Sequence, residues 1–429
     1  MIKQFVFSIT LVISLAFLFH TLRRLYSYLL LTRDAFPVKN LSRRFLLMFR
    51  VAFGQTKIFR RPVIGLFHAI VFWGFCVILF GSIEMITDGL SGSERSFKFL
   101  GPVYNIIVAS GDVFGLLVAV SILVFLGRRL FMHIGRFEGI EMKSNSHLDA
   151  RIALGMIFLL MVSLLGMNSA YYAVVTHTAQ PLFGIYPFSQ HLDFLFEKCS
   201  IGTITLVYEI SWWLHILLIF LFANILPYSK HFHVFMSVPN VFLSRLEPLG
   251  KLTNMDSITR EVRLILDPTY ACHGSPPDSV PERFGIKDVE DISWKNYLDA
   301  LSCTECGRCT SVCPANLTEK RLSPRKIMMD ARARMKEKGP GLIKHGISYN
   351  DNKSLLRDYI TEEELWGCTT CNACAMECPI NINHPSLIID LRRYLVMEEA
   401  SAPGELKGVF NNIENNGAPW KFSPEDRLK

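Results

Sequence analysis

Long apolar runs fill the first half of this 429-residue chain and stop near residue 230. A helix that spans a bilayer needs about 20 predominantly apolar residues. After residue 230 the chain has the polar composition of an ordinary soluble protein. The pattern therefore predicts a membrane part followed by a soluble part. Five stretches are long enough to span: about 4–22, 63–87, 102–127, 152–176 and 206–227.

The basic residues predict the orientation of these helices. The segment from Arg23 to Arg61 holds ten basic residues against one acid, Asp34, whereas the stretch 177–205 offers only Lys198. Because cytoplasmic loops are rich in Lys and Arg, we expect the N-terminus outside the cell and the soluble part in the cytoplasm. The third connection adds further basic residues to the inner side: Arg128, Arg129, Arg136, Lys143 and Arg151.

The first apolar run and the net charge indicate where the protein is located and which partners it requires. The first apolar run lacks a small-residue cleavage site, so we interpret it as a retained helix rather than a signal peptide. The expected location is the inner (cytoplasmic) membrane, crossed several times. The net charge of +7 is explained by basic loops that face anionic lipid, so it does not call for a nucleic-acid partner.

Eight of the eleven cysteines lie in two copies of one motif, "CTECGRCTSVCP" and "CTTCNACAMECP". The spacing C-x₂-C-x₂-C-x₃-C-P is typical of [4Fe–4S] binding. Three thiolates two residues apart can hold three corners of a cubane, while the last cysteine, before proline, reaches the other cluster. Zinc is the alternative, but zinc sites rarely crowd four cysteines twice over. The predicted ligand sets are Cys303, Cys306, Cys309 and Cys378 for one cluster, and Cys368, Cys371, Cys374 and Cys313 for the other.

Histidines within the apolar runs are candidate ligands of a b-type haem, which takes neutral imidazoles from two helices. His68 lies near the inner end of the second helix, His215 in the middle of the fifth, and His233 after it. Eighteen residues separate His215 from His233 (233 − 215), about five turns of a continuous helix. Both would then face the same way at different depths and could not share an iron, unless Pro227 kinks the helix between them. The partner of His68 stays open, and a structural hydrogen bond is the alternative role.

Three acids also fall within predicted helices: Glu84, Asp112 and Glu209. Carboxylates are costly in hydrocarbon and often mark proton pathways. They are candidates for the proton transfers that accompany quinone chemistry. The alternative is a structural hydrogen bond to a neighbouring helix.

The soluble part is predicted to be helical. Ser323 and Pro324 open a helix that we expect to close at Gly339, and Thr361 with Glu364 has the pattern of a capping box. A nucleotide-binding glycine fingerprint and a nucleophile–base pair are both absent from the sequence. The predicted fold is all-α, with these parts: a five-helix membrane domain at 1–235, a connector at 236–294, a two-[4Fe–4S] ferredoxin-like domain at 295–400 and a tail at 401–429.

Residues 295–400 resemble the small iron–sulfur subunit of heterodisulfide reductases, through the two cysteine motifs and "SPRKIMM". Residues 1–235 resemble the cytochrome b subunits of respiratory nitrate reductase and membrane heterodisulfide reductase. This resemblance implies haem b, with His68 and His233 as the inner ligands and His215 as an outer one. The outer ligand of the second helix would fall at Ile78. The resemblance therefore favours one haem and leaves His215 open to a quinone role.

These inferences give two functional hypotheses. The first is a quinone-linked oxidoreductase subunit that passes electrons between membrane quinone, haem b, two [4Fe–4S] clusters and a cytoplasmic redox partner, either disulfide-reductase-like or a flavoprotein. In related fused proteins a cysteine-rich catalytic domain follows, so we expect a separate catalytic subunit here. The second hypothesis is a membrane-anchored ferredoxin without haem or quinone chemistry. The sequence does not indicate the direction of electron flow.

Overall fold

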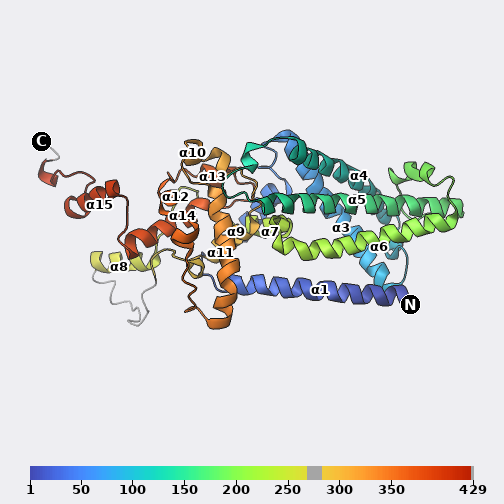
Figure 1. Cartoon of the computed structure of the whole chain (residues 1–429), viewed down its shortest axis with the longest axis horizontal. Helices are drawn as coiled ribbons and strands as arrows, with labels where there is room; N and C mark the ends of the chain where they lie inside the picture. The colour runs from blue at the N-terminus through green and yellow to red at the C-terminus, as the bar shows by residue number, and fades with distance from the viewer. Residues whose placement is uncertain (268–282, 427–429) are drawn as a thin grey trace. The chain divides into compact units, whose positions relative to one another are not determined.

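A computed structural model describes residues 1–267 and 283–426 (Figure 1). Cys272 and part of the Pro/Gly-rich connector lie outside the described residues. The chain divides into two compact units. Unit 1 comprises 1–26 and 45–242, and unit 2 comprises 27–44 and 243–429. The described residues contain helices and no strand, which confirms the predicted all-α class.

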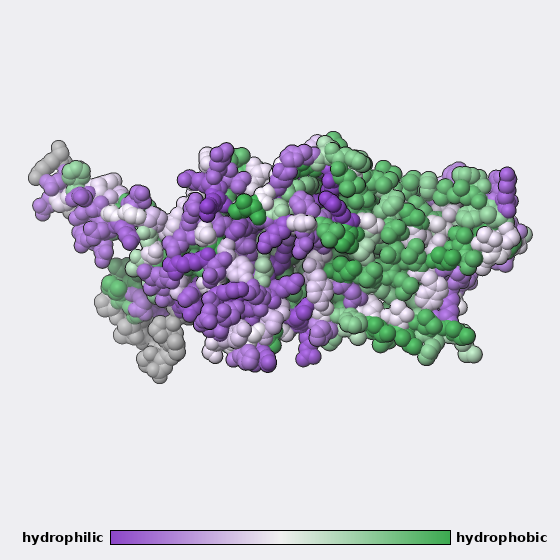
Figure 2. All heavy atoms as spheres, in the orientation of Figure 1, coloured by the Kyte–Doolittle hydropathy of each residue, from purple (hydrophilic) through white to green (hydrophobic). Residues whose placement is uncertain are grey.

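Unit 1 contains five helices that are long and apolar enough to cross a membrane, in agreement with the sequence prediction. Large apolar side chains cover the visible face of these helices in Figure 2. Proline occupies the first turn of both α3 and α4, where its missing N–H costs no hydrogen bond. The helices are α1 Ile2–Leu29, α3 Pro62–Ser91, α4 Pro102–Phe131, α5 Ser144–His177 and α6 Ile201–Ile225.

Small residues let these helices approach closely. Gly89 of α3 lies against the ring of Phe7 on α1, where an added Cβ would fall 2.5 Å from Phe7 Cζ. Phe7 in turn packs against Trp212 and Phe220 of α6. The core of unit 1 therefore joins α1, α3 and α6 on one side. A second cluster of buried residues, including Val118 and Leu160, joins α4 to α5.

The chain does not continue as one helix from His215 to His233. Helix α6 ends at Ile225, and two short 3₁₀ segments, Leu226–Tyr228 and Lys230–Phe232, precede α7 at His233–Phe242. Pro227 lies in the first of these segments, where it has no N–H to continue the helical ladder. The prediction that five continuous turns set the relative direction of the two imidazoles is therefore wrong.

Unit 2 contains the predicted helices with one changed boundary. Ser323 caps α11 by accepting from the Lys326 N–H, and Thr361 and Glu364 form the predicted capping box of α12. However, α11 runs past Gly339 to His345, so the expected end at Gly339 is wrong. The helices around the cysteines are α9 Trp294–Ser302, α11 Pro324–His345, α12 Glu362–Trp366, α13 Ala373–Glu377 and α14 His384–Arg393.

Gly339 has a packing role instead of a terminating one. An added Cβ at this position would lie 2.7 Å from Cε1 of Tyr28, which belongs to the same unit. Tyr28 is buried. The glycine therefore lets this ring lie directly against α11.

A buried charge network holds the segments before and after the first motif together. The Asp288 carboxylate accepts hydrogen bonds from Arg334 and Lys338 of α11, and from the backbone N–H of Leu355. Arg334 also pairs with Asp351 at 2.6 Å. Arg334 is fully buried, so each of these partners offsets part of its desolvation.

Candidate metal centres

The eight motif cysteines line two cavities in unit 2, each with an empty volume of about 320 Å³. The first is lined by Cys303, Cys306, Cys309 and Cys378. The second is lined by Cys368, Cys371, Cys374 and Cys313. Each motif thus gives its last cysteine to the cavity of the other motif. This exchange is the arrangement that the spacing predicts, and the ligation itself stays a prediction.

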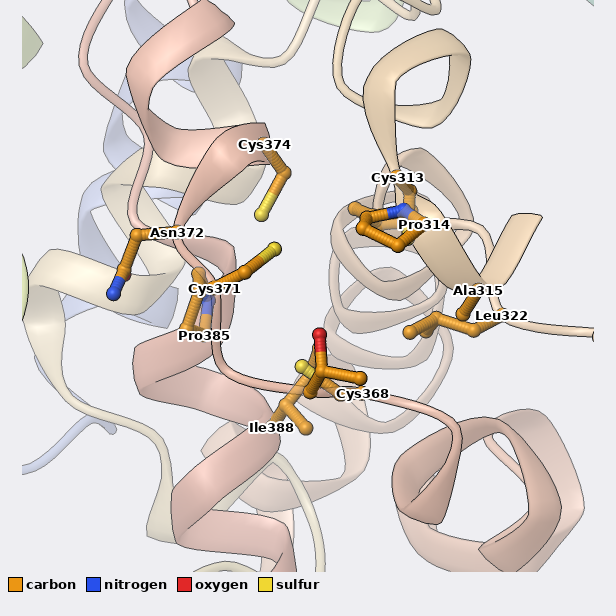
Figure 3. Close-up of a pocket in the computed structure, with 12 residues that line it drawn as sticks. Cys313, Pro314, Ala315, Leu322, Cys368, Cys371, Asn372, Cys374, Pro385 and Ile388 are labelled. Atoms are coloured by element: carbon orange, nitrogen blue, oxygen red, sulfur yellow. The ribbon is translucent and has the colours of Figure 1, made fainter. Parts of the chain in front are cut away.

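Figure 3 shows the second cavity with its lining residues drawn as sticks. The sulfurs of Cys368, Cys371 and Cys374 point into a common space that Cys313 and Pro314 border on the opposite side. Cys374 and Cys313 are buried, whereas Cys371 is exposed. The second cavity therefore reaches the surface of unit 2 at Cys371.

The backbone of the two motifs repeats the same unusual conformation. The second residue after each leading cysteine, Glu305 or Thr370, has a φ of 56° or 55°. The fourth, Gly307 or Asn372, has a φ of 70° or 61°. Left-handed residues turn backbone N–H groups inward, as in anion-binding concavities. In the second motif, the Thr370 N–H lies 3.4 Å from Cys368 Sγ. The loops are thus shaped to donate to thiolate sulfur.

Each motif also has one arginine that contacts its leading cysteine, and the motif pattern did not predict these arginines. Arg332 of α11 donates to the carbonyl oxygen of Cys303 at 2.9 Å. Arg392 of α14 donates to the carbonyl oxygen of Cys368 at 2.5 Å. Arg332 also pairs with Glu305, which holds that residue in its left-handed conformation. Each leading cysteine is therefore fixed by the helix that follows its motif, and each cavity has a nearby guanidinium.

The linings of the two cavities differ in charge. Arg308, Arg325 and His384 line the first, and burial lowers the pKa of His384 to about 3, so its imidazole is neutral. Apart from its cysteines, the second is lined by proline, aliphatic and neutral polar residues, including Pro324 and Ile388. Net charge and exposure set cluster potentials, so these linings predict unequal reduction potentials.

The thiols need a metal partner to ionise. Burial raises the pKa of Cys303 to about 11, and of Cys374 and Cys378 to about 12. Such thiols are protonated at neutral pH when no metal is bound, because a buried thiolate is costly. Iron supplies the positive charge that stabilises the thiolate form. The donor set therefore fits a metal cofactor that is bound with loss of protons.

The arrangement fits a cluster better than a single ion. A zinc ion requires its sulfur ligands at about 2.3 Å from one point. In the part of the chain that the structure describes, no group of three or more His, Cys, Asp or Glu side chains is arranged to hold a single metal ion. Four thiols around a wider cavity instead suit a four-iron cubane, whose corners are separate atoms.

The three candidate haem histidines each place Nδ1 against an oxygen. His215 Nδ1 lies 2.9 Å from the Leu160 carbonyl oxygen, and His233 Nδ1 lies 3.3 Å from that of Lys230. His68 Nδ1 lies 2.9 Å from Gln55 Oε1. A carbonyl only accepts, so Nδ1 of His215 and His233 carries the proton and Nε2 keeps its lone pair. A histidine in this tautomer can bind a metal through Nε2 while Nδ1–H donates to the oxygen that orients the ring. Pairing of His68 with His233 stays a prediction.

The three candidate acids have different surroundings. Asp112 is fully buried and accepts from the backbone N–H groups of Phe188 and Ser189 at 2.8 and 2.9 Å, as well as from side chains. Glu209 forms a half-exposed ion pair with Lys3 at 2.7 Å. These contacts favour structural roles for both. Glu84 is buried in α3 and accepts from the Tyr104 hydroxyl at 3.2 Å.

Comparison with known protein families supports the interpretation of the cysteines. Residues 299–382 match a family model described as a 4Fe-4S dicluster domain. A second model of the same description matches residues 267–318. We refer to residues 299–382, which contain all eight motif cysteines, as the dicluster domain. Both cavities described above are lined mostly by residues of this range, together with His384, Pro385 and Ile388 beyond it.

Several curated proteins are similar to longer parts of the chain. "Probable iron-sulfur-binding oxidoreductase FadF" of Bacillus subtilis is 28% identical over 409 residues, which cover 87% of this chain and 53% of FadF. "EtfAB:quinone oxidoreductase" of Syntrophomonas wolfei is 28% identical over 94% of this chain and 56% of its own length. The chain thus spans about half the length of these relatives.

The dicluster domain has shorter relatives. One subunit of a CoB-CoM heterodisulfide reductase from Methanosarcina acetivorans is 35% identical over 106 residues, which are 25% of this chain and 52% of that protein. This agrees with the resemblance inferred from the motifs. No solved structure matches the chain.

Proposed function

We propose that this chain is a membrane-bound electron-transfer subunit that connects a membrane quinone with a redox partner on the cytoplasmic side. The observation that carries this proposal is the pair of four-cysteine cavities in a chain that also has five membrane-length helices. Similarity to EtfAB:quinone oxidoreductase over 94% of the chain supports the quinone link. The class of reaction is oxidation–reduction.

In this proposal the dicluster domain holds two [4Fe–4S] clusters, which supply one-electron transfer when bound. Cys303, Cys306, Cys309 and Cys378 hold one cluster, and Cys368, Cys371, Cys374 and Cys313 hold the other. The aliphatic walls and the burial of Cys303, Cys309, Cys313, Cys374 and Cys378 keep water from these five sulfurs, whereas Cys371 is exposed. Inward N–H groups, such as that of Thr370, stabilise the thiolates.

The histidines of unit 1 are proposed to hold haem b, which supplies a further one-electron carrier. The support is the Nδ1 contacts that orient His68, His215 and His233. We assign His68 and His233 to one haem. With Ile78 at the position of a further ligand, His215 is left for a second haem or a quinone site.

The redox partner is proposed to be a cytoplasmic protein with disulfide-reductase-like or flavin chemistry. Two relatives motivate this choice: one is named for CoB-CoM heterodisulfide reductase and the other for EtfAB. The proposed location is the cytoplasmic membrane with the N-terminus outside. The basic residues between α1 and α3 support that orientation.

A second candidate function is a membrane-anchored ferredoxin without haem or quinone chemistry. A "Probable membrane-anchored ferredoxin" of Chromohalobacter salexigens is 30% identical over 174 residues, 35% of this chain. This function requires the cysteine cavities and the apolar helices. It gives no role to oriented histidines in unit 1.

The test is a reduced-minus-oxidised visible spectrum of the detergent-purified chain, made under haem-replete conditions, together with iron, sulfide and haem analysis. We expect about eight cluster irons, a b-type haem band and reduction of the haem by a quinol. His68→Ala should abolish the haem band, whereas His20→Ala, outside the candidate set, should leave it unchanged. Full clusters without haem would instead identify the anchored ferredoxin.

A further inference from the structure

Arg95 occupies the connection between α3 and α4 at the end of unit 1 that also holds the N-terminus (Figure 1). Its backbone is left-handed, with φ 57° and ψ 55°. Two acids one turn apart on α3 hold this connection: Asp88 accepts the N–H groups of Arg95 and Ser96, and Glu84 accepts that of Phe97. The fixed backbone directs a charged side chain inward, because Arg95 is only 9% exposed.

Tyrosines from several elements surround the buried guanidinium. Its Cζ lies 4.2 Å from the ring centre of Tyr171 on α5 and 5.6 Å from that of Tyr186. The rings of Tyr171 and Tyr208 lie 6.2 Å apart, which brings α6 into the group. Tyr104 of α4 also interacts electrostatically with Arg95. Aromatic faces of this kind suit a flat ring beside a cation.

The hydrogen bonding of the Arg95 guanidinium is incomplete. Nε and Nη2 of Arg95 are buried, and neither has a hydrogen-bond partner among the residues that the structure describes. Arginine stays protonated, so these N–H groups cannot be removed by titration. A buried donor without an acceptor costs about 1–3 kcal/mol, and more when it is charged. The Tyr104 hydroxyl is a hydrogen-bond partner of Arg95, but Nε and Nη2 still need a further acceptor oxygen.

We propose that Arg95 binds a carbonyl oxygen of a quinone head group, with the surrounding tyrosines against the quinone ring. This inference rests on the proposed quinone function and gives it a location. Glu84 lies beside the site, with its carboxylate hydrogen-bonded to Tyr104. Reduction of a quinone to a quinol takes up two electrons, which the haem and clusters of the proposed function deliver one at a time, and two protons, one exchanged through Glu84 and the other with water at that end of unit 1. Oxidation of a quinol runs the same steps in reverse.

The surroundings favour a quinone over other acceptors. A buried water can join Nε and Nη2 as well, so the crosslinking test below separates the two occupants. The ring faces of Tyr171 and Tyr186 beside the guanidinium favour an apolar ring, and Tyr186 donates its hydroxyl elsewhere, to the Phe183 carbonyl oxygen. A free anion would be attracted to Arg95 but repelled by Glu84 and Asp88, whose carboxylates hold the same connection. A neutral carbonyl on an apolar ring avoids that repulsion.

The first test measures binding of short-chain ubiquinone and short-chain menaquinone to the full chain in nanodiscs, by quenching of intrinsic fluorescence. Arg95→Gln should weaken binding about tenfold or more, which corresponds to about 1.4 kcal/mol. Lys98→Gln, an exposed cation of the same connection, is the matched control and should bind as the wild type does. Thermal unfolding of each variant checks that it is folded.

The second test needs no variant. An azido-quinone is photo-crosslinked to the wild-type chain, and the labelled peptides are mapped by mass spectrometry. Label in 92–104 or 168–172 supports the site. Equal affinity of folded Arg95→Gln, or label confined to other helices, overturns the site while the quinone function stands. Failure of the haem- and cluster-loaded wild type to bind either quinone overturns the proposed function and the site with it.

Discussion

At the scale of single residues, the two motifs are set by a few contacts that recur in both copies. Arg332 and Arg392 bind the carbonyl oxygens of the leading cysteines, Cys303 and Cys368. Both arginines lie in helices well beyond their motifs in the sequence. The cysteine spacing therefore predicted the thiols, whereas the arginines depend on how α11 and α14 fold back. Gly307 and Asn372 were the local hints to the left-handed backbone of the two motifs, since glycine and asparagine tolerate that conformation.

The exchanged cysteines give the first prediction. Cys378→Ser should alter the electron paramagnetic resonance signal that Cys303→Ser also alters, because both residues line the first cavity. Cys374→Ser, only four residues away, should alter the other signal. Cys199→Ser, outside the motifs, is the control and should change neither. A shared effect of Cys374 and Cys378 on one signal would contradict the exchange.

The second prediction concerns Arg332. Arg332→Gln removes a positive charge and a donor near Cys303, so the potential of the first cluster should fall by about 60 mV, a tenfold change for one electron. Redox titration followed by electron paramagnetic resonance measures this shift. Lys344→Gln, an exposed change on the same helix, should leave both potentials unchanged. An equal shift of both clusters would show that Arg332 does not act locally.

The third prediction concerns pH. The Arg334 guanidinium holds the pKa of Asp351 at about 2, below its ordinary value. A depressed carboxyl pKa contributes stability above the unfolded pKa near 3.9, and this stability is lost as the pH falls toward 2. The unfolding temperature of the wild type should exceed that of Asp351→Asn by a constant amount from pH 7 to 5. The difference should narrow below pH 4, and one that widens there would contradict the assignment.

At the scale of elements, the apolar pattern predicted all five membrane-length helices because length and hydropathy are local properties. Two boundaries differ from the prediction, one beside a tertiary contact and one at a local break in the helix. Helix α11 passes through Gly339 because that glycine lies against Tyr28, and the helix after His215 stops where Pro227 interrupts the ladder. The segment 27–44 also belongs to unit 2, which hydropathy does not reveal.

Asp112 gives a prediction at this scale, because its carboxylate ties the segment Ser189–Leu195 to α4 and α5. Asp112→Ala leaves two backbone N–H groups and a serine hydroxyl without their acceptor. We expect a loss of about 3 kcal/mol or more, visible as a lower thermal unfolding temperature in detergent. Glu209→Gln breaks only a half-exposed ion pair and should cost less than about 1 kcal/mol. Equal effects would show that Asp112 is not structural.

At the scale of the whole molecule, the chain combines a membrane-length bundle with a dicluster domain, and the composition change near residue 230 indicates both. The division itself falls at residue 242, seven residues after the predicted 235, because α7 packs with the bundle (242 − 235). The candidate quinone site could not be found from sequence. Its residues come from three helices and two connections, and only the fold brings them together.

The orientation in the membrane gives the prediction at this scale. Green fluorescent protein fused after Lys429 should fluoresce, and alkaline phosphatase at the same position should be inactive, because the basic loops place that end in the cytoplasm. Phosphatase fused after Lys198, between α5 and α6, should be active. The reverse pattern would contradict the assigned topology.

The exchange of cysteines between the two cavities also has a consequence for the connectivity of the chain. Under the proposed ligation, one cluster links Cys309 to Cys378, 69 residues apart (378 − 309), and the other links Cys313 to Cys368, 55 residues apart (368 − 313). Each cross-link closes a loop and lowers the entropy of the unfolded chain, which raises its free energy by roughly 4 kcal/mol for a single loop of this size and by less for the second, because the 313–368 loop lies inside the other. A protease cut within α11 would therefore leave both fragments joined through iron and sulfur, and they would separate only when the iron is removed.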